Sequence, residues 1–171
     1  MGRGCVCVPA AVPHQTTTMS TEPPRARRDH PVTLFRLGSI WLLVAAAGHA
    51  VAHALFYLRE SSFTAERLAI VRVMQAFAAD GIPGTSLWTI FQSFSLLFFL
   101  FLCHAGLHGL LTLRGVPDPP RLRRLAGFNA VFWSVSCALL AALHPVLQPL
   151  VITGVAFLFF GASYLTSPDG P

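Results

Sequence analysis

Five histidines in the apolar part of the chain are the residues whose type and spacing could support specific chemistry. They are His49, His53, His104, His108 and His144. The first four form two pairs whose partners are four residues apart, and residues i and i+4 of a helix lie about 6 Å apart on one face. Each pair can therefore address one neighbouring group or one metal ion.

Three uses of these imidazoles stay open at this point. They can hydrogen-bond between helices, as polar side chains do inside membranes. They can ligate a haem b iron axially, with His49 or His53 opposite His144. They can form a transition-metal site or conduit from His49, His53 and His144, because three imidazoles suit zinc or copper. His104 with His108 offers a second metal position. The cofactor is therefore haem b, a transition metal, or none.

The composition limits the kind of protein that carries these histidines. The chain has 54% hydrophobic and only 11% charged residues, and its mean hydropathy is +0.61. A soluble domain has about 25% charged residues, so we do not expect a soluble enzyme. Three long runs contain no charged residue: 37–58, 81–113 and 125–168.

These runs predict four membrane-spanning helices. A helix needs about 20 apolar residues to cross a bilayer, and the third run is long enough for two, divided at Pro145 and Pro149. We expect spans near 34–58, 86–113, 125–144 and 146–166. The fold class is all-α, a four-span transmembrane helical bundle spanning 33–166. Residues 1–32 and 167–171 are expected to be a disordered N-terminal tail and a short C-terminal tail.

The arginines predict the orientation of the spans. Nine of the twelve basic residues precede the first span or lie between the second and third. Because positive residues concentrate in cytoplasmic segments, both termini are expected in the cytoplasm. Topology and the lipid bilayer then account for the basicity, and we expect no nucleic-acid partner.

The segment between the first two spans, residues 61–80, predicts an amphipathic outer helix. Thr64 can cap its start and Glu66 lies in the first turn, where the helix dipole favours an acid. Gly81 and Pro83 are expected to end it. We expect this helix to lie on the membrane surface or to cover the bundle.

The threading predicts two polar layers inside the membrane. His49, His53, Gln92 and His144 fall toward the outer surface, whereas His104, His108 and Asn129 fall toward the cytoplasmic surface. Catalytic motifs are missing: there is no Walker sequence or Ser-His-Asp order, and Cys103 and Cys137 lie singly in spans. We therefore predict no catalytic residue, and a homo-oligomer or a membrane-protein partner is open.

Three short motifs stand out: Gly48-His49, Met74 in the outer segment, and Ser86-Leu87-Trp88 at the start of the second span. Together they resemble a family of small four-helix bacterial integral membrane proteins of uncharacterised function. The resemblance covers about 33–165. It implies a compact four-span protein of the bacterial inner membrane, with Gly48, His49 and Trp88 as notable positions. Apart from the resemblance, we expect a structural or interaction role.

Overall fold

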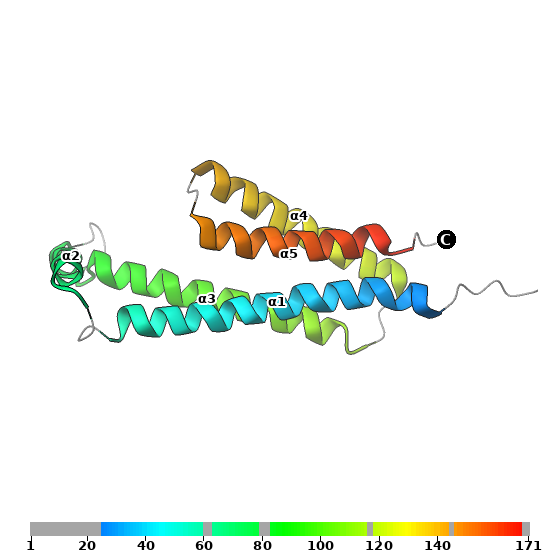
Figure 1. The fold of residues 1–171 in the computed structure, drawn as a ribbon, viewed down its shortest axis with the longest axis horizontal. Coiled ribbons are helices and arrows are strands. Elements are labelled where there is room, and N and C mark those ends of the chain that lie inside the picture. The colour runs from blue at the N-terminus through cyan, green and yellow to red at the C-terminus, as the bar shows by residue number, and fades with distance from the viewer. Residues whose placement is uncertain (1–24, 60–62, 79–82, 116–117, 144–145, 169–171) are drawn as a thin grey trace, which may run out of the picture.

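The computed structural model describes residues 25–59, 63–78, 83–115, 118–143 and 146–168. It is built from helices (Figure 1): α1 (Arg25–Tyr57), α2 (Ala65–Ala76), α3 (Leu87–Thr112), α4 (Pro119–Leu143) and α5 (Leu147–Thr166). The all-α prediction is confirmed. All but α2 are long and apolar enough to cross a membrane.

The outer surface of these four helices is apolar. Large hydrophobic side chains are exposed on each of them, including Val44, Phe94, Phe128 and Leu158, which are 58 to 73% exposed. A water-soluble protein rarely exposes continuous apolar surface of this extent, whereas lipid accommodates it without cost. The chain is therefore a multi-pass membrane protein.

Two helices begin earlier than the sequence predicted. Helix α1 starts at Arg25, so residues 25–32 are helical and do not belong to a disordered tail; residues 1–24 lie outside the described part. Helix α4 starts at Pro119, where 125 was expected. Counting uncharged residues finds the part of a helix that lies in lipid, but helices continue past the hydrocarbon. Proline is also tolerated in a first helical turn, as at Pro119.

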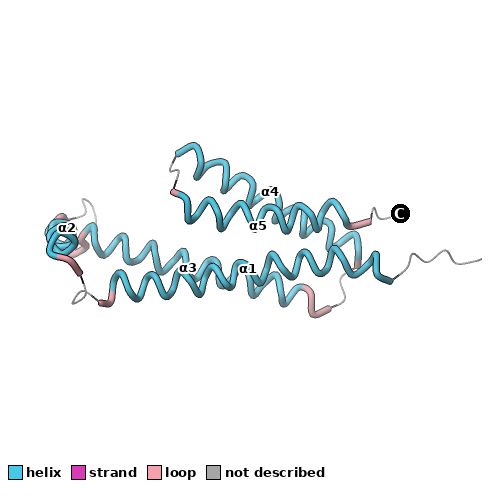
Figure 2. The backbone as a smooth tube through the Cα atoms, in the orientation of Figure 1, coloured by secondary structure: helices cyan, strands magenta, loops and turns pink. Residues whose placement is uncertain are grey.

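The four long helices are arranged in the spatial order α3, α1, α5, α4. Helix α1 packs against α3 and α5, and α4 packs against α5. The predicted hairpin of the last two spans is thus present. The start of α1 and the end of α5 lie at the same end of the bundle, and α2 lies crosswise at the other end, as the backbone trace also shows (Figures 1 and 2).

Hydrogen bonds to backbone carbonyls join α1 to α5. The Trp41 indole nitrogen donates to the carbonyl oxygen of Ile152 at 3.1 Å, and the Ser163 hydroxyl donates to that of Pro31 at 2.8 Å. Ser163 is fully buried. In lipid such polar groups have no water to bind, so both bonds fix how the two helices align.

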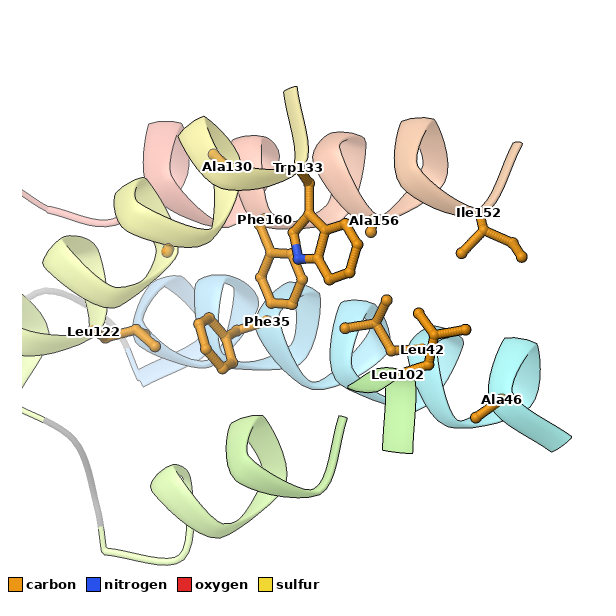
Figure 3. Packing of buried hydrophobic residues seen from close by; sticks show 11 residues of the cluster. Phe35, Leu42, Ala46, Leu102, Leu122, Ala130, Trp133, Ile152, Ala156 and Phe160 are labelled. Carbon is orange, nitrogen blue, oxygen red and sulfur yellow. The ribbon is translucent and has the colours of Figure 1, made fainter. Parts of the chain in front are cut away.

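Apolar side chains from all four long helices fill the space between them. Phe35 of α1 and Phe160 of α5 meet edge to face with centroids 5.0 Å apart, and Trp133 of α4 projects toward them (Figure 3). Trp133 also contacts Phe101 of α3 at a centroid distance of 6.0 Å. The aromatic rings therefore connect α4 with α3, which are not adjacent in the order α3, α1, α5, α4.

Two glycines set the close approach of α1 and α3. A Cβ atom on Gly106 would lie 2.7 Å from Leu43 Cγ and 2.8 Å from the backbone oxygen of Ser39, and one on Gly109 would collide with the Ser39 side chain. Small residues at these positions let the two backbones come together, as in other membrane helix pairs. Gly48 does not take part, because a Cβ atom added to it would meet no other atom within 4 Å.

Helix α2 is held at both of its ends. The Thr64 side chain accepts a hydrogen bond from the backbone N–H of Arg67, which confirms Thr64 as the N-cap. The helix ends at Ala76, before the expected stop at Gly81 and Pro83. The backbone N–H of Leu87 then donates to the carbonyl oxygen of Phe77 at 2.9 Å, which ties this end to the start of α3.

We expect Gly106→Ala to destabilise the protein by about 1 to 3 kcal/mol, because the added methyl group meets the Ser39 backbone, which cannot rotate away. Unfolding in mixed detergent micelles, followed by circular dichroism, measures this loss. Gly48→Ala is the matched control, since its methyl group enters open space. Equal stability of the two variants would contradict the close approach described above.

Candidate functional site

His49 and His53 of α1 converge on one serine of α3. His49 Nε2 lies 3.0 Å from both the hydroxyl and the backbone oxygen of Ser95, and His53 Nδ1 lies 2.9 Å from the same hydroxyl. All three residues are half-buried. The i, i+4 spacing predicted that both imidazoles could address one neighbour, and Ser95 is that neighbour.

The hydrogen atoms of this cluster follow from what each group can donate. A carbonyl oxygen only accepts, so His49 Nε2 carries a hydrogen and donates to the Ser95 backbone. We assign the one hydrogen of the Ser95 hydroxyl to the bond with His53 Nδ1, since the hydroxyl oxygen already accepts from His49 Nε2. His53 in its neutral form then carries its own hydrogen on Nε2. The result is a chain of donors running from His49 through Ser95 to His53.

An axial haem ligand needs a ring nitrogen with a free lone pair, usually Nε2. Here Nε2 of His49 is occupied by Ser95, and Nε2 of His53 carries a hydrogen. Ligation of haem iron through Nε2 of His49 would require its bonds to Ser95 to break. The other tautomer of His53 would donate from Nδ1 to the Ser95 hydroxyl and leave Nε2 able to bind iron, so haem b stays a prediction. His144, the expected opposite ligand, lies outside the described residues.

The remaining members of the expected layers make other contacts. Gln92 is half-buried on α3, three residues before Ser95, and hydrogen-bonds neither imidazole in the described structure. Asn129 donates to the carbonyl oxygen of Leu125 on its own helix at 2.9 Å. These amides therefore do not extend the His49–Ser95–His53 cluster.

His104 and His108 lie on the outside of the bundle. Both are exposed, and their rings stack with centroids 6.0 Å apart. His104 follows Ser95 by nine residues, which turns the helix by about 180°, so this pair faces away from α1. The two histidine pairs have the same spacing but different surroundings, since one is enclosed by the chain and the other is presented to lipid.

Metal binding by three or more ligands has no support from the described residues. They contain no group of three or more His, Cys, Asp or Glu side chains placed to hold a metal ion. Cys103 and Cys137 are half-buried free thiols on separate helices. The three-imidazole site that includes His144 stays a prediction, because that residue is not described.

Trp88 is buried at the end of the bundle that carries α2. It is 5% exposed and packs with Phe63 and Val71, and its ring lies 4.9 Å from that of Tyr57. Trp88 therefore joins the start of α3 to α2 and to the end of α1.

The sequence did not single out Ser95. Serines in apolar helices commonly bond a carbonyl on their own helix, as Ser39 and Ser136 do here. The sequence did hold a signal for Ser95. In a pair of antiparallel helices, some turns of the second helix must face His49 and His53, and a polar residue in those turns is a candidate partner. The register of the two helices, which the sequence does not state, was needed to use it.

Comparison with protein-family models, with curated proteins and with solved structures gave no match. The resemblance to a bacterial four-helix family therefore stays a prediction.

We expect Ser95→Ala to lower the free energy of unfolding by about 1 to 2 kcal/mol, because it removes the hydroxyl that both imidazoles contact. Steric-trap or detergent unfolding in lipid bicelles measures the change. Ser93→Ala is the control, since Ser93 is exposed on the same helix. A loss of similar size in both variants would show that the cluster does not stabilise the fold.

The donor chain also predicts the histidine tautomers. At neutral pH, 15N solid-state NMR of the protein in lipid should show His49 and His53 with hydrogen on Nε2 and with unprotonated Nδ1. In Ser95→Ala the hydrogen-bond shift of His53 Nδ1 should disappear. Hydrogen on Nδ1 of His53 in the unmodified protein would contradict the assignment.

Proposed function

We propose that this chain is a structural or interaction protein of the bacterial inner membrane, with both termini in the cytoplasm, and that it binds a second copy of itself through α3. The arginine distribution and the resemblance to bacterial four-helix proteins support the location. The exposed pair of His104 and His108 is the observation that supports the interaction role.

Polar side chains facing lipid are costly and find partners where they can. Measured from the end of α3 at Thr112, His108 and His104 lie about 6 and 12 Å inside the helix, so both reach below the membrane surface. No other described side chain hydrogen-bonds them; His108 offers only its backbone oxygen, to Thr112. A partner helix that covers this face of α3 would remove the free-energy cost of exposing the two imidazoles to lipid.

A second copy is a suitable partner because the pair is self-complementary. A neutral imidazole carries one donor and one acceptor, so two identical pairs related by a two-fold axis can satisfy each other. Exposed leucines beside the pair, Leu100, Leu107 and Leu111, supply apolar contact around it. Two facing pairs would also offer four imidazoles to one zinc ion, which is the second use of the same residues.

Disulfide crosslinking in native membranes tests the proposal. In a background without the native cysteines, we expect Leu111→Cys to form a covalent dimer, since Leu111 lies on the histidine face of α3. Leu165→Cys on α5 is the control, because it is also exposed and lies near the same end of the bundle. Replacing His104 and His108 together by leucine should weaken dimerisation roughly tenfold, whereas glutamine should largely preserve it.

The outcomes separate the alternatives. Crosslinking that depends on the histidines but not on a chelator supports direct hydrogen bonds between copies. Loss of the dimer on chelation, with stoichiometric metal in the sample, would favour the shared zinc site. Equal crosslinking at Leu111 and Leu165, or none at Leu111, would contradict an α3 interface.

A further inference from the structure

A groove opens at the end of the bundle where α2 crosses α1 and α3. Its volume is about 700 Å³, and its walls are mainly apolar and aromatic, formed by Phe56, Ile70, Val71, Met74, Trp88 and Phe91. Binding sites for small ligands have volumes of roughly 300 to 1,000 Å³ and similar walls. The polar residues of the groove are Tyr57, Thr64, Glu66 and Arg67.

Arg67 is the unusual residue of this groove. Its guanidinium carbon lies 3.9 Å from the ring centroids of both Phe56 and Phe63, which are 6.1 Å apart, so the cation sits in the wedge between two rings. Its Nε atom is buried and has no hydrogen-bond partner among the described residues. The rings hold the guanidinium in place, but they do not accept hydrogen bonds from its N–H groups as an oxygen atom does.

This arrangement suits an oxyanion. A guanidinium presents a planar fork of N–H donors that matches phosphate or carboxylate, and an unpaired buried donor costs about 1 to 3 kcal/mol until it is satisfied. The neighbouring acid Glu66 is exposed and forms no ion pair with Arg67 within the described chain. The charge of Arg67 is therefore available to a ligand.

The location indicates which oxyanion it is. The groove lies where α1 ends at Tyr57 and α3 begins at Leu87, which is the level at which two spans leave the hydrocarbon. Lipid phosphates lie at this level, and two of the apolar lining residues, Phe56 and Phe91, belong to the two spans themselves. Helix α2 lies crosswise over this end, as an interfacial helix does (Figure 1).

We propose that this groove binds one anionic phospholipid, with its phosphate on Arg67 and the beginning of an acyl chain along Phe56, Ile70 and Phe91. The site is separate from the α3 face that carries His104 and His108, so either proposal can fail without the other. The rings of Phe56 and Phe63 act as positioning groups, because they hold the guanidinium between them.

Native mass spectrometry of the full chain tests this site, with phosphatidylglycerol or phosphatidylcholine added to the detergent-purified protein. We expect one tightly bound phosphatidylglycerol and no comparable phosphatidylcholine adduct. Arg67→Gln should weaken that binding roughly tenfold or more, since a charge-assisted hydrogen bond is lost. Arg72→Gln, which removes the same charge from an exposed position of α2, should leave it within roughly twofold.

A second pair of matched variants tests the site even if the Arg67 variant misfolds. Ile70 lines the groove and Val73 does not, and they are 62 and 68% exposed, so glutamate is tolerated by the fold at both positions. Ile70→Glu should repel the phosphate and weaken binding, whereas Val73→Glu should not. Equal effects within either pair, or equal binding of soluble glycerol 3-phosphate, would overturn the proposal.

Discussion

Every polar group inside a membrane has to find its partner within the protein, and this requirement organises the whole structure. Four helices satisfy their own backbones, and a few polar side chains then join one helix to the next. Ser163 and Trp41 use carbonyl oxygens across the α1–α5 contact, and Ser95 serves two imidazoles across α1–α3. The buried indole nitrogen of Trp133 is an exception, since it has no partner among the described residues.

Helices α1 and α3 illustrate how one register serves several contacts. Along α1, Ser39 meets Gly109, His49 meets Phe98 and Tyr57 meets Trp88, so positions on α3 fall steadily as those on α1 rise. The glycine contact at one end and the tryptophan contact at the other therefore fix where the histidines lie relative to Ser95. A change at Gly109 would reach the histidine cluster through this register even though the two are far apart along the helix.

The sequence predicted what depends on composition and missed what depends on register. Runs without charge were enough to find four spans, because hydrocarbon excludes charge wherever a helix crosses it. The same counting placed the beginning of α1 too late, since a helix needs no lipid to continue to Arg25. Gly48 was a notable position of the resemblance but has open space around it, whereas Gly106 and Gly109 form the close contact. Apolar residues surround every side of these helices, so hydropathy does not say which face meets a neighbour.

The two histidine pairs show that the face of the helix on which a pair lies matters more than the spacing between its two residues. Each pair follows the same i, i+4 rule, and each lies in an apolar helix. His49 and His53 point toward α3 and hydrogen-bond Ser95 there, whereas His104 and His108 point away from α1, about 180° and 140° from the Ser95 face. Within the described chain, the first pair thus completes a contact and the second leaves one incomplete. The interface proposed on α3 rests on this difference, because its polar pair has no side-chain partner within the described residues.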